Sequence, residues 1–473
     1  MLPLTLAEVA AACGGELRGG RRGTVVASAT TDSRRLEPGD LFIGLRGESF
    51  DGDAYAAAAL AAGAAAVVVR EQTAAALPAD APAIVVDDGL RALQALATEV
   101  RRRSGARVVG ITGSAGKTST KDILTALLRP VARTVATTAN HNNEVGVPLT
   151  LLAVEPDTEV VVVEMAMRGR GQIRALAQVA LPDVGVITTI APVHLELVGT
   201  IEDVAAAKAE LIEELGGGTV VVPAGERLLE PHLAAFRGRV VTFGEPDADV
   251  HFTDVERRGD GTQVLVDAFR HRAKMLFSFT GGHYLRDALA ALGAFVELGY
   301  PLDKARTGAA QVAFSDLRGA VSALAGGGLL LNDAYNANPV AMRAALDHLA
   351  SIADGRPKVA VIGDMYELGE GAPAYHHDVG RYCDDIGVRL VAVGELARAY
   401  LTGARGERWF ATVDECVTAL PEVVPPGSAV LVKASRGLRL ERVAAALTAG
   451  SSAPDEAAAA AGSVPPSRER ADA

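Results

Sequence analysis

The sequence contains few cysteines, few aromatic residues and no long uninterrupted apolar run. Only three cysteines occur in 473 residues, Cys13, Cys383 and Cys416, and no two of them form a Cys-x-x-Cys pair. This number and spacing exclude a disulfide framework and a cysteine-based zinc site. We expect the three cysteines to be buried, reduced thiols.

Membrane-spanning and secretory features are also missing. No stretch approaches the ~20 apolar residues that a transmembrane helix needs. The segment Met1–Thr5 lacks the charged and then apolar layout of a signal peptide. We therefore expect a cytoplasmic protein without a membrane span.

Basic residues are outnumbered. The chain has 46 Lys and Arg against 58 Asp and Glu, a formal net charge of -12. A polynucleotide partner requires a broad basic face, so this balance argues against a nucleic-acid-binding protein. A local group of basic residues at a nucleotide site is compatible with it.

The length predicts about three domains. Short apolar runs separated by alanine-rich stretches indicate a small α/β domain over residues 1–104. Its expected strands are Thr24–Ala27, Asp40–Ile43, Ala66–Val69 and Ala83–Val86. The arginines at 101–103 mark either a charged joint between domains or a solvated helix end.

Residues 105–316 are expected to form a central α/β domain. Its β-branched runs alternate with helical stretches, which indicates a parallel sheet covered on both faces. The expected strands are Glu159–Val163, Val184–Thr188, Thr219–Val222 and Val240–Phe243. After Asp249, alternating segments joined by turns predict an antiparallel appendage.

Residues 317–450 are expected to form a Rossmann-like α/β domain. Its predicted strands are Leu329–Leu331, Val359–Ile362, Leu390–Val393 and Ala429–Val432. Residues 451–473 are rich in Ala, Ser, Pro and acidic residues, and such a segment buries too little apolar surface to offset the entropy of ordering. We expect it to be a disordered tail.

A glycine-rich loop lies between a predicted strand and a predicted helix at 111–120, with the sequence Ile-Thr-Gly-Ser-Ala-Gly-Lys-Thr-Ser-Thr. Its amides and the helix N-terminus can cradle phosphate, Lys117 can reach a terminal phosphate and the Thr118 hydroxyl can bind Mg²⁺. The general P-loop pattern has Gly where Ile111 stands, so this is the shorter Gly-x-x-Gly-Lys-Thr form. The loop predicts a nucleoside triphosphate site; the alternative is a glycine-rich turn without a ligand.

Three polar residues lie near the ends of the central strands. Glu164 follows one strand, His194 lies beyond the next, and Lys208 is in the helical run after it. Ligands collect at the carboxyl ends of strands in open α/β sheets, so a carboxylate and an imidazole there can hold a divalent cation. Taken alone, His194 can equally be an exposed histidine and Lys208 a helix-surface lysine.

Several motifs occur in the order found in the bacterial Mur ligases, and the chain resembles that family over about residues 28–445. The motifs are Thr112–Thr118, Asn142–Pro148, Glu164–Met165, His194–Glu196, Lys208–Leu211, Asp333–Pro339, Gly363–Gly369 and Lys433–Arg436. Thr31–Arg34 and Gly47–Gly52 resemble the family's uridine-nucleotide-binding region. The Tyr335–Pro339 and Gly363–Gly369 segments are most similar to the members that act on D-alanyl-D-alanine.

The resemblance implies ATP-dependent, ADP-forming amide synthesis through an acyl phosphate, in peptidoglycan precursor synthesis. A carboxylate of UDP-N-acetylmuramoyl-tripeptide attacks the γ-phosphate, and the amine of D-alanyl-D-alanine then displaces phosphate. The implied catalytic residues are Lys117, Glu164, His194 and Lys208. The resemblance also implies two Mg²⁺ sites, with Thr118 at one and Glu164 and His194 at the other, and a carbamate on Lys208. Carbamylation turns a repelling cation into an oxygen ligand suited to hard Mg²⁺.

The resemblance also assigns residues to the ligands. Those expected at the nucleotide are Gly113, Ser114, Ala115, Gly116, Lys117, Thr118, Ser119, His283, Asp287, Arg318 and Asp333, the last accepting from the ribose. Those expected at the other substrates are Ser33, Arg34, Asn142, Asn143, Asn336, Asn338, Lys433, Ser435 and Arg436. Because these residues come from three domains, the domains must close around the substrates. We expect a monomer.

Some positions depart from the family pattern. The adenine-contact segment of the family carries asparagines where this chain has Tyr284 and Asp287, and an aspartate can accept from the adenine amine but cannot donate as an amide does. Asp53 replaces a histidine, and Ala166 and Ala434 replace glycines. These departures leave open a Mur-type ligase of altered acyl or amine specificity. A catalytically inactive nucleotide-binding regulator is a further alternative, although a mere binder needs no second metal site.

Overall fold

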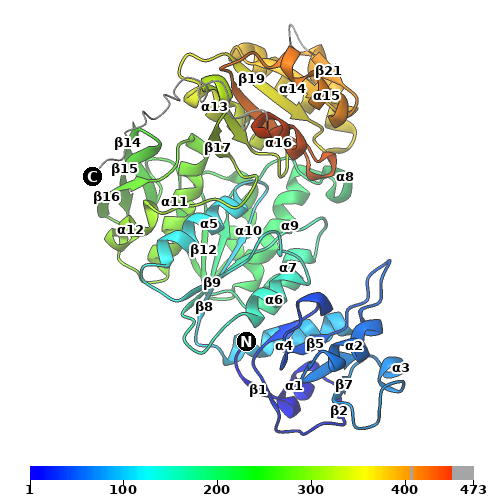
Figure 1. Ribbon diagram of the computed structural model, residues 1–473. Coiled ribbons are helices and arrows are strands. Elements are labelled where there is room, and N and C mark those ends of the chain that lie inside the picture. Colours follow the sequence, from blue (N-terminus) through cyan, green and yellow to red (C-terminus); the bar gives the residue numbers. More distant parts are fainter. Residues whose placement is uncertain (405–407, 450–473) are drawn as a thin grey trace, which may run out of the picture.

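Three α/β units follow one another along the chain, each built on its own sheet (Figure 1). The structure is a computed structural model that describes residues 1–404 and 408–449. The segment 451–473, expected to be a disordered tail, lies outside the described residues. The N-terminal unit lies at one end of the molecule, the central unit in the middle and the C-terminal unit at the other end.

The N-terminal unit carries a five-stranded sheet in the order β2-β7-β6-β5-β4, parallel except for β2. Its strands are β2 Glu16–Arg18, β4 Ala29–Thr30, β5 Leu41–Ile43, β6 Ala66–Val69 and β7 Ala83–Val85. β1 (Leu4–Thr5) and β3 (Val25–Val26) pair separately. The helices are α1 Leu6–Cys13, α2 Ala56–Ala61, α3 Glu71–Ala74 and α4 Gly89–Arg103. All four predicted strands are present, the first of them outside the main sheet.

The last turn of α4 joins the N-terminal unit to the central unit. Arg101 donates to the carbonyls of Ala180 and Leu181 and pairs with Asp183 at 3.0 Å. Arg103 instead pairs within the N-terminal unit, with Glu99 of its own helix and with Glu8 of α1. Of the two alternatives for the arginine run, the joint therefore applies to Arg101 and the solvated helix end to Arg103.

The central unit carries a nine-stranded sheet in the order β16-β15-β14-β13-β12-β11-β8-β10-β9. Its strands are β8 Arg107–Thr112, β9 Thr134–Ala136, β10 Val160–Glu164, β11 Val184–Ile187, β12 Thr219–Pro223, β13 Arg239–Phe243, β14 Val250–Arg258, β15 Gly261–Ala268 and β16 His271–Phe277. The sheet is parallel from β9 to β14 and antiparallel beyond. The predicted antiparallel segment exists, but it extends this sheet rather than forming a separate appendage, because β14 pairs with β13.

Helices cover both faces of the parallel part. Val161 and Val163 pack into one core and Val160 and Val162 into the other, which explains why β10 is an uninterrupted apolar run. The helices of this unit are α5 Lys117–Leu128, α6 Gly146–Leu152, α7 Gln172–Ala180, α8 Leu195–Val198, α9 Ile201–Glu214, α10 Glu230–Ala235, α11 Gly282–Glu297 and α12 Ala305–Ala309.

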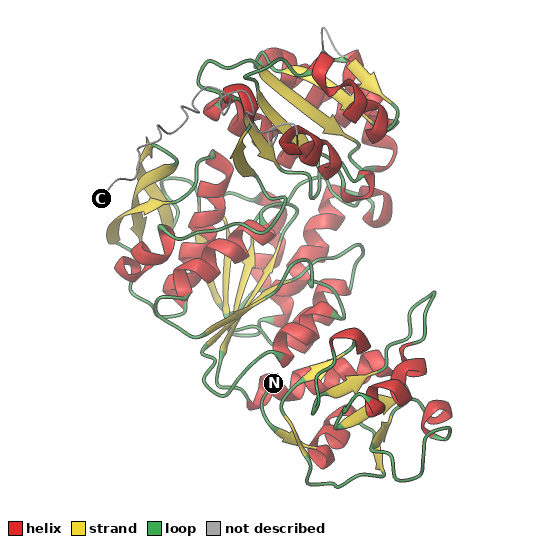
Figure 2. Cartoon of the chain, in the orientation of Figure 1, coloured by secondary structure: helices red, strands yellow, loops and turns green. Residues whose placement is uncertain are grey.

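The C-terminal unit carries a six-stranded sheet in the order β17-β18-β22-β19-β20-β21 (Figure 2). Its strands are β17 Ala320–Ala323, β18 Leu329–Asn332, β19 Lys358–Gly363, β20 Arg389–Val393, β21 Arg408–Phe410 and β22 Ala429–Lys433. Its helices are α13 Pro339–Ile352, α14 Ala372–Asp385, α15 Val413–Val423 and α16 Glu441–Ala449. The four predicted strands form the parallel centre, and the two edge strands were not predicted.

The boundaries expected at 104/105 and 316/317 fall between these sheets and remain a prediction. Cys383 and Cys416 are buried free thiols, whereas Cys13 is only partly buried. Over the described residues, no helix is both long and apolar enough to cross a membrane.

Candidate active site

The glycine-rich loop connects β8 to the N-terminus of α5 and has room for little besides glycine. Gly113 (φ +151°) and Gly116 (φ +80°) are held so closely that an added Cβ would lie 1.9 Å from Thr188 Oγ1 and 2.2 Å from Asp287 Oδ1. The Ser114 hydroxyl donates to the carbonyl of Ala191 and accepts from its N–H, both at 2.9 Å. The loop is therefore a fixed turn at the carboxyl edge of the sheet, as a phosphate cradle requires.

The remaining loop residues surround the start of α5. Thr118 and Ser119 are buried, and the carbonyl of Ala115 accepts from Thr188. Lys117 folds back so that its Nζ donates to the carbonyl of Gly113 at 2.8 Å. Burial lowers the pKa of Lys117, and the charge of Glu164 opposes that shift. A γ-phosphate at this loop would restore the full charge of the ammonium group.

Glu164 ends β10 and is 1% exposed. Its Oε1 accepts from Asn142 Nδ2 at 2.7 Å, and its N–H donates to Thr137 Oγ1 at 2.9 Å. Its Oε2 is buried and has no hydrogen-bond partner among the described residues. A buried carboxylate oxygen without a donor is costly unless a cation meets it, so the oxygen fits a Mg²⁺ ligand. Asn142, expected to face the acyl substrate, lies on this carboxylate instead.

Lys208 lies on the inner side of α9 and is 2% exposed. The helix-surface alternative for Lys208 is therefore wrong. Burial lowers the pKa of Lys208 well below its ordinary value, and the charge of Lys117 lowers it further. This setting favours the neutral amine, which is the nucleophilic form of a lysine.

His194 precedes α8 and is held by the C-terminal unit. It has a positive φ of 55°, and its Nδ1 contacts the carboxylate of Glu367. Burial lowers the pKa of His194, Glu367 opposes this, and the charges of Lys117 and Lys208 lower it further. Lys117, Glu164, His194 and Lys208 thus share one electrostatic environment. Glu367 lies in the Gly363–Gly369 motif, but no sequence pattern connects it with His194.

Two histidines meet where α11 faces the C-terminal unit. His283 and His348 have ring centroids 5.7 Å apart, and each has a buried Nδ1 without a partner in the described part of the chain. Burial lowers the pKa of His283 to about 3 and that of His348 to about 4, so both are neutral. His348, on α13, was not among the predicted site residues. Its only signal in the sequence is an imidazole on an apolar helix, which is usually structural.

Asp287 is 9% exposed and lies against Gly116 of the phosphate loop. Burial raises its pKa to about 8, against the opposing charges of Arg286 and Arg318. With its pKa raised in this way, the Asp287 carboxyl can carry a proton at neutral pH and can then both donate and accept a hydrogen bond. The departure from asparagine is smaller than the sequence suggests.

Tyr284, the second departure in this segment, has a structural role. Its ring stacks on Phe314 with centroids 4.3 Å apart, and its hydroxyl donates to the carbonyl of Arg318 at 3.1 Å. The Arg318 guanidinium lies 3.9 Å from the centre of the Tyr335 ring. Tyr284 thus fixes the linker that carries Arg318 towards the site.

The C-terminal unit reaches the phosphate loop through Asn338. Its Oδ1 caps α13 by accepting from the N–H of Ala341 at 2.9 Å, and its Nδ2 donates to the carbonyl of Ser114 at 3.3 Å. Behind it, Lys433 Nζ pairs with Asp333 at 2.5 Å and donates to the carbonyl of Asn336 at 2.8 Å. Lys433, expected at the substrates, is therefore buried and bonded within the C-terminal unit.

Other expected substrate residues have partners inside the protein. Asn143 Oδ1 caps the start of α6 by accepting from Gly146 N–H at 2.9 Å. Ser435 is buried and accepts from the N–H of Tyr366. Arg34 forms an ion pair with Asp32, and Arg436 forms one with Glu441. Ser33 begins the short 3-10 turn that contains Arg34. None of these five is brought to the phosphate loop by a contact in the described residues.

The other departures also stay within the protein. Asp53, where the family has a histidine, pairs with Arg70 Nε at 2.9 Å. The Ala434 methyl group is fully buried beside Gly363. The N–H of Ala166 donates to the carbonyl of Asn142 at 2.9 Å. The Asp53 side chain and the Ala434 methyl group are thus accommodated within the protein, whereas the Ala166 contact is a main-chain bond that does not depend on the side chain.

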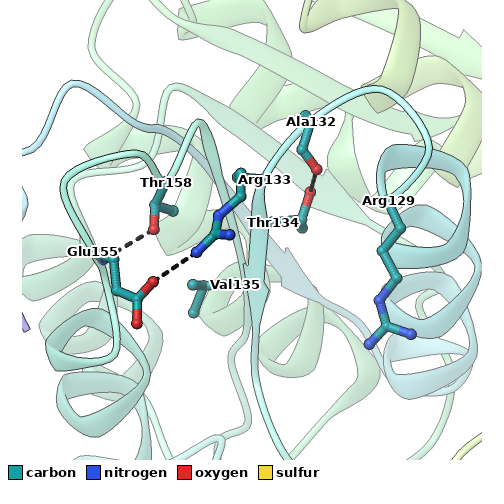
Figure 3. Close-up of a pocket in the computed structure, with 7 residues that line it drawn as sticks. All are labelled: Arg129, Ala132, Arg133, Thr134, Val135, Glu155 and Thr158. Carbon is teal, nitrogen blue, oxygen red and sulfur yellow. Dashed lines mark hydrogen bonds and ion pairs between the residues drawn. The ribbon is translucent and has the colours of Figure 1, made fainter.

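A separate cavity of about 360 Å³ lies beside the edge strand β9, lined by Arg129, Ala132, Arg133, Thr134, Val135, Glu155 and Thr158 (Figure 3). Arg133 turns to Glu155 at 2.7 Å. This cavity adjoins the first residues of β9, at the opposite end of the parallel strands from the phosphate loop. In the described residues, no three His, Cys, Asp or Glu side chains gather as a metal cluster, so a Mg²⁺ ion at Glu164 would need ligands beyond side chains of these four types.

Known families match the three units in order. The Mur ligase family catalytic domain matches residues 26–101, the Mur ligase middle domain 111–295, and the Mur ligase glutamate ligase domain 318–436. The UDP-N-acetylmuramoyl-tripeptide–D-alanyl-D-alanine ligase of Bacillus subtilis is 33% identical over 429 residues, covering 89% of this chain and 93% of the relative.

Solved structures agree. A crystal structure of MurF from Acinetobacter baumannii superposes with a TM-score of 0.85 at 30% identity, covering 94% of this chain and 99% of that one. MurF from Thermotoga maritima in complex with ADP superposes at 0.80 with 28% identity, covering 89% and 97%. The predicted resemblance is confirmed, and this chain belongs to the Mur ligase family, with its three-domain fold and its ATP-dependent, ADP-forming ligase chemistry.

Proposed function

We propose that the chain is an ATP-dependent ligase that adds D-alanyl-D-alanine to UDP-N-acetylmuramoyl-tripeptide in peptidoglycan precursor synthesis. The observation that carries the proposal is the phosphate loop at Lys117. Lys117 interacts electrostatically with Glu164 and Lys208, and Asn338 donates a hydrogen bond to the loop carbonyl of Ser114. Relatives bearing this function in their names cover nearly the whole chain. Because the reaction uses ATP and a UDP-linked substrate, we assign it to the cytoplasm. We also propose that the protein acts as a monomer.

Mg²⁺ fits the donor groups of this site. Thr118 would hold one ion beside the phosphates, and Glu164, His194 and a carbamate on Lys208 would hold a second. The unpartnered Oε2 of Glu164 supports this assignment. When bound, Mg²⁺ neutralises charge on the phosphate oxygens.

The burial of Lys208 supports the carbamate. Its unprotonated amine attacks the carbon of CO₂: an N–C bond forms, one C–O π bond breaks with its electron pair moving to oxygen, and one proton passes from the nitrogen to solvent. The product is an anionic oxygen ligand in place of an amine. Burial at 2% exposure favours the reaction, since an ammonium group at the same place has no lone pair to attack with.

The chain's own groups then act on the substrates. Lys117 and the amides after Gly113 stabilise the negative charge that develops as the γ-phosphoryl group transfers to the carboxylate. ADP leaves, the amine of the dipeptide attacks the acyl carbon, and the C–O bond to phosphate breaks. We assign His283 and Asp287 to the adenine side, and Ser33 and Arg34 to the uridine nucleotide.

A Mur-type ligase of altered specificity is the alternative, since Tyr284 and Asp287 replace the family's asparagines. Phosphate release measured across muramoyl peptides and amines separates the two. The expected result is fast release only with ATP, Mg²⁺, UDP-muramoyl tripeptide and D-alanyl-D-alanine together, and far slower release with D-alanine. If only a different amine or acyl peptide stimulates release, the proposed substrates are wrong and the ligase class stands.

A further inference from the structure

We propose that Glu367 is a positioning residue: it fixes the imidazole of His194 across the junction between the central and C-terminal units, so that the metal site is complete only when the two units are closed. The inference rests on the proposed role of His194 as a metal ligand. It adds a residue whose effect passes through another side chain and depends on domain arrangement.

The first observation is the contact itself. Nδ1 of His194 meets Oε2 of Glu367, and these residues lie on different units. With the carboxylate of Glu367 as acceptor, the proton of this contact lies on Nδ1. Nε2 therefore keeps its lone pair, which is the form in which an imidazole binds a metal ion.

The second observation is that the backbone holds both residues in this arrangement. His194 and Glu367 have φ values of +55° and +62°, a region that non-glycine residues occupy at a cost and keep only where the surroundings fix it. Beside them, the N–H of Glu196 donates to the carbonyl of Glu367 at 3.4 Å. The two loops are thus joined through main chain as well as side chain.

The third observation concerns what else could hold the ring. Over the described residues, the Glu367 carboxylate is the hydrogen-bond partner of the His194 ring, and Arg168 Nε lies 3.9 Å from the other oxygen of Glu367. The Glu367 loop belongs to the C-terminal unit, so opening of the units removes this partner. His194 then loses the group that sets its tautomer and orientation.

The chain offers a matched control for a change that only weakens the junction. Arg257, on β14, donates to the carbonyl of Ser351 in the C-terminal unit at 2.6 Å and is 42% exposed. It bridges the same two units but has no contact with His194 or the phosphate loop. R257A therefore reports the effect of loosening the junction alone.

The test measures Mn²⁺ binding by electron paramagnetic resonance in the full-length protein, with a non-hydrolysable ATP analogue and UDP-muramoyl tripeptide. We expect E367A to weaken the Mn²⁺ site about 10- to 100-fold, as loss of a partner behind a ligating histidine does. E367Q, which keeps an accepting oxygen, should restore most of the affinity, and R257A should match wild type. In turnover, E367A should lower kcat and raise the Mg²⁺ requirement, with a small change in KM for ATP.

Two results would overturn the inference. The first is a Mn²⁺ affinity of E367A within twofold of wild type. The second is an equal loss of Mn²⁺ affinity in E367A and R257A, which would show that Glu367 only holds the two units together. E367D shortens the reach by one methylene and carries the same expectation if E367A does not fold. Failure of the proposed function is distinguishable, because wild-type protein would then show no Mg²⁺-dependent phosphate release with its substrates. Normal release together with unchanged Mn²⁺ binding in E367A refutes only the role of Glu367.

Discussion

At the scale of single residues, the pKa of an ionisable side chain at the site depends on how deeply that side chain is buried. Lys208 and Asp287 are both nearly buried, and burial moves their pKa values in opposite directions, down for the amine and up for the carboxyl. Both shifts favour the neutral form of the group, beside a site for a polyanion. A neutral Lys208 can react with CO₂, and a neutral Asp287 does not repel phosphate.

Lys208→Ala should be nearly inactive, because the variant can form no carbamate. Millimolar formate or acetate should restore part of the rate by placing a carboxylate oxygen in the vacated space. In the wild-type protein, ¹³C-labelled bicarbonate should give a carbamate resonance in the NMR spectrum that the variant lacks. Lys304→Ala, at an exposed position, is the control. Full activity of Lys208→Ala without additive would refute the carbamate.

Asp287 should make stability depend on pH. Its pKa is about 8 in the folded protein and ~3.9 in the unfolded chain, so the folded state holds a proton that the unfolded state has lost between these values. The contribution of Asp287 to the unfolding free energy is therefore largest below pH 4. It falls by up to about 1.4 kcal/mol per pH unit until pH 8.

Asp287→Asn should remove this dependence. The difference in melting temperature between variant and wild type, measured without nucleotide, should grow in favour of the variant from pH 5 to pH 8 and then level off. Other titrating groups cancel in the difference. Parallel curves for the two proteins would show that Asp287 is ionised in the folded protein throughout this pH range.

At the scale of helices and strands, α5 ties the phosphate loop to the interdomain linker. Lys121 and Asp122, 5% and 9% exposed, form a buried pair at 2.8 Å. Lys121 Nζ also donates to the carbonyl of Thr137, and Ser315 of the linker donates to both oxygens of Asp122. The segment that leads to the C-terminal unit is thus anchored to the helix that begins at the phosphate loop.

Asp122→Ala should destabilise the central unit strongly, since it leaves the Lys121 ammonium buried without a carboxylate. Loss of one partner of a buried pair costs about 3–5 kcal/mol, or about 10 °C in the melting transition of a domain this size. Asp157→Ala, which breaks an exposed pair with Arg133 on the same unit, should change it by at most about 2 °C. Equal shifts for the two variants, measured by circular dichroism, would contradict the anchoring role.

The sequence predicted elements well where the pattern is periodic and poorly at sheet edges. The β-branched runs at β6, β10 and β22 are buried on both faces, and that requirement is visible in their composition. β17 is exposed throughout, so nothing in its sequence marks it as a strand. The buried Lys121–Asp122 pair could not be predicted either, because adjacent charges in a helix are usually solvated.

At the scale of the whole molecule, the site exists because distant segments meet. The sequence could supply the residues of the phosphate loop, Glu164, His194 and Lys208 through their motifs. It could not supply the contacts of His194 with Glu367 or of Asn338 with Ser114, which join residues 173 and 224 positions apart. Such contacts depend on how two units pack, and no local pattern encodes that.

The Asn338 contact should couple nucleotide binding to closure of the units. Asn338→Asp keeps the acceptor that caps α13 but replaces the Nδ2 donor to Ser114 with a carboxylate, which repels that carbonyl and the phosphates beyond it. The variant should keep the melting temperature of wild type in the absence of ligand. With an ATP analogue and UDP-muramoyl tripeptide, small-angle X-ray scattering should show wild type becoming more compact and the variant remaining extended.

The same variant should raise KM for D-alanyl-D-alanine more than KM for the UDP-linked tripeptide. The dipeptide reacts last and needs the closed arrangement to position its amine against the acyl carbon, whereas the tripeptide is expected to bind the N-terminal and central units. Asn338→Ala serves as the comparison, because it loses the donor without adding a charge and also loses the helix cap. If Asn338→Asp compacts with the ligands as wild type does, the contact with Ser114 is incidental, and closure must be driven by other contacts of the phosphate loop.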